Sequence, residues 1–143
     1  MLEAFASAEV EFLVVGAHAM AVHGVPRATG DLDLWVRPTA LNAARVWSAL
    51  KAFGAHLSQH GVSVGDYKTP GTVYQLGLPP RRIDVLTQIS GVTFEAAWQT
   101  RLELSLQNHP VGFLRREILI ANKRAAAREK DLLDVKLLLD SPK

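Results

Sequence analysis

The segment Asp31-Leu-Asp-Leu-Trp-Val36 alternates polar and apolar side chains, and it carries two of the acidic residues on which the functional interpretation depends. Such alternation is typical of a β-strand, in which successive side chains point to opposite faces. Asp31 and Asp33 therefore share one face, where their like charges repel unless a cation lies between them. Oxygen ligands of this kind favour Mg²⁺ or Mn²⁺. The pair indicates either a divalent metal site or a solvated polar face on an edge strand.

A third acidic residue, Asp84, lies in the apolar segment Arg82–Leu86, which is also predicted to be a strand. An unpaired buried carboxylate among core-facing side chains is costly, so Asp84 indicates a functional role. If this strand lies beside the first one, Asp84 completes a cluster of three carboxylates able to hold two metal ions. The alternative is a surface ion pair between Asp84 and Arg81 or Arg82.

The pair Gly16-Ala17 joins a predicted buried strand over residues 11–15 to a predicted helix over residues 17–23. A helix N-terminus exposes free backbone N–H groups, and small residues let a phosphate approach them. Many strand-to-helix turns need glycine for structural reasons alone, so that interpretation stays open. The sequence contains neither a Walker A loop nor a Gly-x-Gly-x-x-Gly fingerprint.

The remaining pattern predicts helices mixed with strands. Helices are expected over residues 2–8, 39–53, 93–98 and 115–139, the last one either continuous or broken near residues 128–129. Strands are expected over residues 31–36, 72–76, 82–87, 102–106 and 111–113, with 72–76 and 82–87 forming a hairpin and 54–71 mostly loop. This order predicts an α/β or α+β fold, with helices packed against a mixed β-sheet and a helical C-terminal segment.

Composition narrows the class of protein further. The chain has 143 residues, no cysteine and a formal net charge of +2. Its length predicts a single domain spanning residues 1–143. The absence of cysteine excludes disulfide scaffolds, cysteine-based zinc sites and thiol nucleophiles. No apolar run approaches the roughly 18 residues of a membrane span, so we expect a cytoplasmic protein without membrane contact. The mild charge neither requires nor excludes a nucleic-acid partner.

The order of these motifs resembles that of the polymerase-β-like nucleotidyltransferase superfamily. That family has an apolar residue, Gly, then Gly or Ser, followed after a spacer by Asp-x-Asp and later by an Asp between apolar residues. Val15-Gly16-Ala17, Asp31-Leu-Asp33 and Ile83-Asp84-Val85 follow this order, with Ala17 as the departure. The segments Val22–Leu34, Arg82–Trp98 and Ile120–Asp134 look more specifically like small bacterial and archaeal members grouped with AbiEii-type toxin transferases. The resemblance covers nearly the whole chain.

The resemblance implies a nucleotidyltransferase fold and the Mg²⁺- or Mn²⁺-dependent transfer of a nucleoside monophosphate from an NTP, ATP in the first place, to a hydroxyl group. Asp31 and Asp33 would bind both metal ions and Asp84 one of them, while backbone N–H groups of Gly16 and Ala17 would steady the triphosphate. The acceptor would be a protein, as in toxin–antitoxin pairs, or the 3′ end of a tRNA. The alternative is a nucleotide- or partner-binding module without turnover, which the departure at Ala17 favours. Association of identical copies also stays open.

Other residues have both a functional and a structural interpretation. Arg27, before the Asp31 strand, could reach a phosphate or be an ordinary loop arginine. In AbiEii-type relatives a late Lys and a late Asp contribute to the active site, and Lys123 and Asp131 match them. Their spacing would put them on one side of a continuous helix, where a structural salt bridge is the alternative. Trp35 could stack on a base and His18 could touch phosphate, although core packing explains each of them as well.

Overall fold

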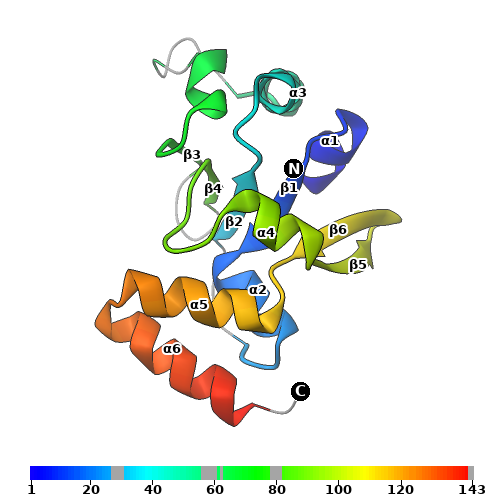
Figure 1. Ribbon diagram of the computed structural model, residues 1–143. Helices are drawn as coiled ribbons and strands as arrows, with labels where there is room; N and C mark the ends of the chain where they lie inside the picture. Colours follow the sequence, from blue (N-terminus) through cyan, green and yellow to red (C-terminus); the bar gives the residue numbers. More distant parts are fainter. Residues whose placement is uncertain (27–30, 56–60, 62, 78–81, 142–143) are drawn as a thin grey trace.

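The computed structural model describes residues 1–26, 31–55, 61, 63–77 and 82–141. Its centre is a six-stranded mixed sheet with the strand order β3-β4-β2-β1-β6-β5 (Figure 1). The strands are β1 (Phe12–Val15), β2 (Leu32–Val36), β3 (Val73–Leu76), β4 (Ile83–Leu86), β5 (Leu102–Leu106) and β6 (His109–Phe113). The helices are α1 (Leu2–Ser7), α2 (Gly16–Val22), α3 (Ala40–Phe53), the 3₁₀ helix η2 (Val64–Lys68), α4 (Phe94–Gln99), α5 (Arg116–Ala126) and α6 (Glu129–Asp140). The predicted fold class is confirmed.

Strand register brings the acidic segments together. β2 pairs with β1 in antiparallel and with β4 in parallel orientation. In these pairings Asp33 lies opposite Val15 on one side and opposite Asp84 on the other. The end of β1 and the beginnings of β2 and β4 therefore meet at one edge of the sheet. The predicted hairpin is confirmed, since β3 pairs with β4 in antiparallel orientation.

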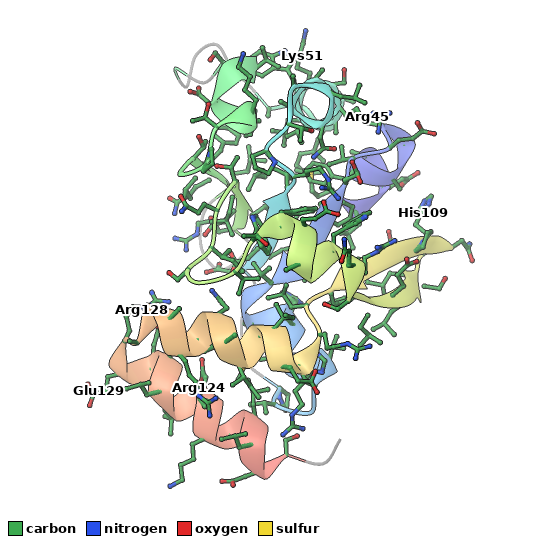
Figure 2. All side chains as sticks on the ribbon, viewed as in Figure 1. Arg45, Lys51, His109, Arg124, Arg128 and Glu129 are labelled. Atoms are coloured by element: carbon green, nitrogen blue, oxygen red, sulfur yellow. The ribbon has the colours of Figure 1, made fainter. Side chains whose placement is uncertain are left out.

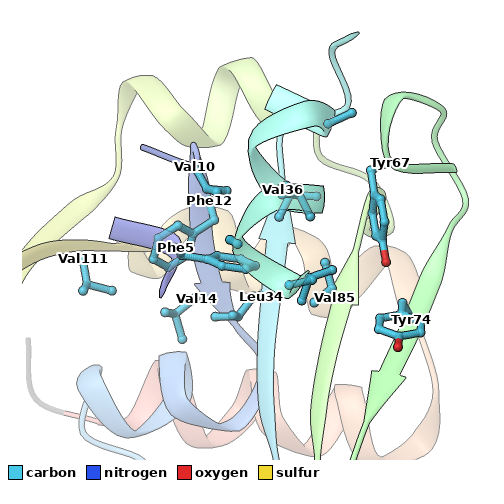
Figure 3. Packing of buried hydrophobic residues seen from close by; sticks show 14 of the residues in the cluster. Phe5, Val10, Phe12, Val14, Leu34, Val36, Tyr67, Tyr74, Val85 and Val111 are labelled. Atoms are coloured by element: carbon cyan, nitrogen blue, oxygen red, sulfur yellow. The ribbon is translucent and has the colours of Figure 1, made fainter. Parts of the chain in front are cut away.

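Apolar side chains fill both faces of the sheet. On one face Val14, Leu34 and Val85 pack with Phe5 of α1 and with α3 and η2 (Figure 3). On the other face Leu13, Val15 and Trp35 pack with α2, α4, α5 and α6. Alternation along β1 and β2 divides these side chains between the two cores. Asp33 and Trp35 consequently share the second face, on which α5 and α6 lie.

Polar contacts fix the entry into α3. The Thr39 hydroxyl caps this helix by accepting a hydrogen bond from the backbone N–H of Asn42. The buried Asn42 side chain accepts from the backbone N–H of Glu11 and donates to the carbonyls of Glu11 and Arg37. Asn42 thus ties α3 to β1 and β2 at the ends of these strands that lie away from Asp31 and Asp33.

The C-terminal helical region is broken, as one of the two sequence alternatives predicts. α5 ends at Ala126, and Ala127 adopts a left-handed conformation with φ +54° before α6 begins at Glu129. The two helices then lie side by side (Figure 1). The expectation that Lys123 and Asp131 lie on one continuous helix is therefore wrong, because they face each other across the break.

Two further differences concern the sequence pattern. Within the described part of residues 54–71, which was predicted to be mostly loop, the regular element is η2, held by reciprocal bonds between Ser63 and Asp66. β6 begins at His109, two residues before the predicted start of the strand at residue 111. No helix in the described part of the chain is long and apolar enough to cross a membrane.

Candidate active site

A cavity of about 700 Å³ opens at the sheet edge where β1 ends and β2 and β4 begin. The sheet edge and α2 form one wall, and α5 and α6 form the opposite wall. Leu86, Met20 and Ile89 add apolar surface between them. Most of the residues singled out from the sequence line this cavity: Gly16, Ala17, Asp31, Asp33, Asp84, Lys123 and Asp131.

The three carboxylates of the sheet edge meet around Arg82. Its Nε lies 3.1 Å from Asp84 Oδ1, and its Nη2 lies 3.4 Å from both Asp84 Oδ2 and Asp31 Oδ2. Asp84 is buried, while Asp31 is partly exposed at the cavity mouth. From the sequence, Asp84 was expected either in a cluster of three carboxylates or in a surface ion pair with an arginine. The structure shows both, because Asp84 contacts Arg82 and also lies with Asp31 and Asp33 in one cavity.

Asp33 has an unfavourable electrostatic environment. Burial, the neighbouring charges of Asp84 and Asp31 and a hydrogen bond to the Asp84 side chain raise the pKa of Asp33 from 3.8 to about 6. The positive charge of Arg82 lowers this pKa but does not cancel the rise. The cluster therefore carries more negative charge than the guanidinium compensates.

Gly16 has to be glycine at this position. Its φ of +68° is in the left-handed region, which side-chain-bearing residues rarely adopt. A Cβ on Gly16 would also collide with the Asp33 carboxylate. The turn thus lets the backbone of Gly16 approach Asp33 directly, and Ala17 follows as the next residue of α2 in the cavity wall.

A second charged cluster forms the opposite wall. Lys123 Nζ of α5 donates to Asp131 Oδ1 at 3.5 Å and to Asp134 Oδ2 at 3.0 Å, both on α6. Burial lowers the pKa of Lys123, although the nearby Asp131 opposes this shift. Burial alone would raise the pKa of Asp131, but the hydrogen bonds and charge of Arg128 outweigh it and lower this pKa. The cluster is a buried ion-pair network whose charges are well matched.

Arg128 closes this network at the junction of α5 and α6 (Figure 2). Its Nε donates to Asp131 Oδ2 at 2.6 Å, and its backbone N–H donates to the same oxygen at 3.2 Å. Asp131 therefore caps the first turn of α6 while it is completely buried. This explains how the chain turns sharply after the left-handed Ala127.

The three carboxylates are suitable ligands for a divalent cation by their chemistry, but their present positions do not form a metal site. Asp31, Asp33 and Asp84 supply only oxygen ligands, and Asp84 Oδ1 is a buried atom without a hydrogen-bond partner. The raised pKa of Asp33 marks negative charge that a dication would relieve. Among the described residues, however, no three acidic, histidine or cysteine side chains are spaced to hold a metal ion as they stand. The predicted ligands are together, and the Arg82 guanidinium lies between two of them.

Several predicted residues lie elsewhere. Trp35 is buried, packs edge-to-face against Phe94 and does not line the cavity, so the core interpretation is confirmed. His18 lines a separate, mainly apolar hollow of about 450 Å³ instead of the acidic cavity. Arg27 lies outside the described residues.

Several polar residues that line the cavity were not singled out from the sequence, among them Ser90, Asn122, Arg128 and Asp134. Asp134 could have been found, because the buried face of α6 comprises Asp131, Asp134, Val135 and Leu138 at helical spacing. An acidic side chain at a core-facing position signals a buried partner. Asn122 and Ser90 gave no such signal; the Asn122 amide donates to the Ser90 carbonyl and joins α5 to the loop after β4.

Solved structures share this fold. A candidate nucleotidyltransferase from Thermotoga maritima superimposes with a TM-score of 0.55 and 12% sequence identity, over 96% of this chain and 88% of its own. The lincosamide antibiotic adenylyltransferase LnuA, in a lincomycin-bound structure, gives a TM-score of 0.54 and 13% identity, over 97% and 92% of the two chains. No family model matches the chain, and no curated protein matches it in sequence. The chain therefore has the nucleotidyltransferase fold, while its grouping with AbiEii-type proteins stays a prediction.

Proposed function

We propose that the protein is a metal-dependent nucleotidyltransferase that moves a nucleoside monophosphate from an NTP to a hydroxyl acceptor. The observation that carries this proposal is the convergence of Asp31, Asp33, Asp84 and Gly16 on one cavity of a nucleotidyltransferase fold. LnuA, which shares the fold, is an adenylyltransferase, and this favours ATP as the donor. Residues from three separate stretches of the chain line this cavity, and this supports the proposal.

In this proposal Asp31, Asp33 and Asp84 would hold two Mg²⁺ or Mn²⁺ ions. Such ions, when bound, lower the pKa of the attacking hydroxyl and neutralise charge on the phosphates. The chain's own contribution is positioning. Gly16 and Ala17 offer backbone N–H groups to the triphosphate at a turn where no side chain intervenes.

Arg128 and Lys130 of the opposite wall are the cations that we propose for contact with the same phosphates. Lys123 also lines the cavity. Arg128 presents a largely exposed side chain, whereas the Lys123 ammonium is buried against Asp131 and Asp134. We assign Lys123 to holding α5 and α6 together through its ion pairs with Asp131 and Asp134. Arg27 remains a proposed phosphate contact from the loop before Asp31.

The acceptor is proposed from the resemblance: a protein of a toxin–antitoxin pair or the 3′ end of a tRNA. The second candidate function is a nucleotide-binding module without turnover, and Ala17 favours it, because the family uses Gly or Ser at that position. The Ala17→Ser variant separates these candidates. In an active enzyme the added hydroxyl contributes one phosphate contact, so we expect tighter ATP binding and faster transfer; a pure binding module gains affinity without transfer.

Transfer of label from α-³²P-NTP tests the function directly. The full chain is incubated with Mg²⁺, each of the four labelled NTPs, and either total tRNA or a protein extract as acceptor. Asp33→Asn and Asp84→Asn remove proposed metal ligands, and Asp140→Asn makes the same change at an exposed site of α6. We expect labelled acceptor with the wild type and Asp140→Asn and none with the other two. Nucleotide binding without labelling of any acceptor would favour the module.

A further inference from the structure

We propose that Arg82 is an internal counter-ion of the acidic cluster, which a divalent cation must displace before the three carboxylates can ligate it. The inference deepens the proposed function and rests on it for the identity of the site. It assigns to Arg82 a positioning role: the side chain holds the carboxylates together without metal and makes metal binding depend on a second anion that attracts the guanidinium.

Arg82 occupies the position between the carboxylates where a cation would bind, but its contacts with them are long. The guanidinium bridges carboxylates from two segments, Asp31 before β2 and Asp84 in β4, at 3.1–3.4 Å. Charge-assisted hydrogen bonds are shorter, about 2.7–2.9 Å. Arg82 Nε and Asp84 Oδ1 are both buried and, although 3.1 Å apart, they are not aligned as a hydrogen bond. These two buried polar atoms thus lie close together without forming a hydrogen bond, and this costs free energy.

Arg128 in the same cavity shows what a structural arginine looks like in this protein. Its Nε donates to Asp131 at 2.6 Å, Nη2 makes a second bond at 3.3 Å, and its backbone N–H makes a third at 3.2 Å. Asp131 also forms an ion pair with Lys123. The contacts of Arg128 with Asp131 are therefore aligned hydrogen bonds, whereas the contact between Arg82 Nε and Asp84 Oδ1 is not.

Charge balance explains why the exchange is conditional. One guanidinium supplies a single positive charge to a cluster of three carboxylates, and its contacts reach Asp31 and Asp84. A dication supplies two charges at shorter contact, but it requires the guanidinium to leave. The planar guanidinium of arginine binds phosphate readily. A triphosphate that enters the same cavity therefore offers the displaced Arg82 side chain a new partner. Metal and nucleotide are then expected to enter together, and the metal alone to bind weakly.

Manganese binding to the nucleotide-free full chain tests this inference. The fraction of free Mn²⁺ is measured by electron paramagnetic resonance for the wild type, Arg82→Gln, Arg82→Lys and Arg128→Gln. We expect Arg82→Gln to bind Mn²⁺ at least tenfold more tightly than the wild type and Arg128→Gln to stay within twofold. Arg82→Lys keeps the charge but cannot bridge two carboxylates, so we expect at least threefold tightening. The tightening in Arg82→Gln should vanish when Asp84→Asn is added.

Equal or weaker Mn²⁺ binding in Arg82→Gln would overturn the inference, as would equal tightening in Arg128→Gln. If Arg82→Gln does not fold, as judged by circular dichroism, Arg82→Lys decides, and an affinity equal to that of the wild type overturns the inference. These measurements need neither nucleotide nor acceptor. If the protein transfers nucleotide but Arg82→Gln does not change its Mn²⁺ affinity, only the inference is refuted. If Arg82→Gln binds Mn²⁺ more tightly but the wild type transfers no nucleotide, only the proposed function is refuted.

Discussion

Replacing Asp33 by Asn should stabilise the protein while abolishing the proposed activity. The pKa of Asp33 rises from 3.8 to about 6 on folding, because the carboxylate is buried beside Asp84 and Asp31. At about 1.36 kcal/mol per pKa unit, ionising Asp33 in the folded state costs up to about 3 kcal/mol. Asp33 is only half-buried, so solvent screening reduces the expected cost to about 1–2 kcal/mol. Asn keeps the shape of the side chain and removes the charge.

The pH dependence of this gain has a defined sign. Between pH 3.8 and about 6 the folded state retains a proton on Asp33 that the unfolded state has released. The contribution of Asp33 to stability therefore falls as the pH rises through this window, and the full cost is present above it. Asp33→Asn should be more stable than the wild type at pH 7.5, and this gain should shrink toward zero as the pH falls below the window.

Thermal unfolding without metal or nucleotide measures the gain. For a chain of this size about 1–2 kcal/mol corresponds to a rise in Tm of about 3–6 °C at pH 7.5. Asp31→Asn is the matched control, because it removes the same charge at a more exposed site and loses the contact with Arg82. No gain in Asp33→Asn, or the same gain in Asp31→Asn, would refute the argument from burial and local repulsion.

Three further predictions concern the walls of the site and its support. Lys123→Met leaves Asp131 and Asp134 buried without the ammonium, so urea unfolding should show a loss of about 3–5 kcal/mol; a loss below 1 kcal/mol contradicts the buried network. Gly16→Ala should lower nucleotide transfer at least about 100-fold, because its Cβ collides with Asp33; wild-type transfer would show that the turn adapts. Asn42→Ala removes three hydrogen bonds and should cost about 2–4 kcal/mol in the same unfolding assay, with nucleotide affinity unchanged; altered affinity would connect α3 to the site.

The parts of the site that could be predicted are those with short-range signals. Strand alternation placed Asp31 and Asp33 on one face, and an acidic residue in an apolar strand marked Asp84. Their meeting depends on β2 and β4 being neighbours in register. Sequence spacing could suggest this pairing but not establish it, because register is set by the packing of both faces.

Other features depend on tertiary contacts that leave a weak local trace. The helix break at Ala127 uses an alanine in the left-handed region, where glycine would be the usual signal. α3 leaves the large apolar side chains of Leu41 and Phe53 exposed and buries the smaller Ala43 and Ala49 together with Val46. Side-chain size alone therefore does not identify the buried face of this helix.

A crystal structure with Mn²⁺ and a non-hydrolysable ATP analogue, with anomalous scattering recorded from the metal, tests the central claim most directly. We expect manganese peaks at about 2.1 Å from carboxylate oxygens of Asp33 and Asp84, with the triphosphate beside Gly16 and the Arg82 guanidinium moved out of the cluster. An ordered nucleotide bound away from this cavity, with no manganese touching the three carboxylates, would contradict it.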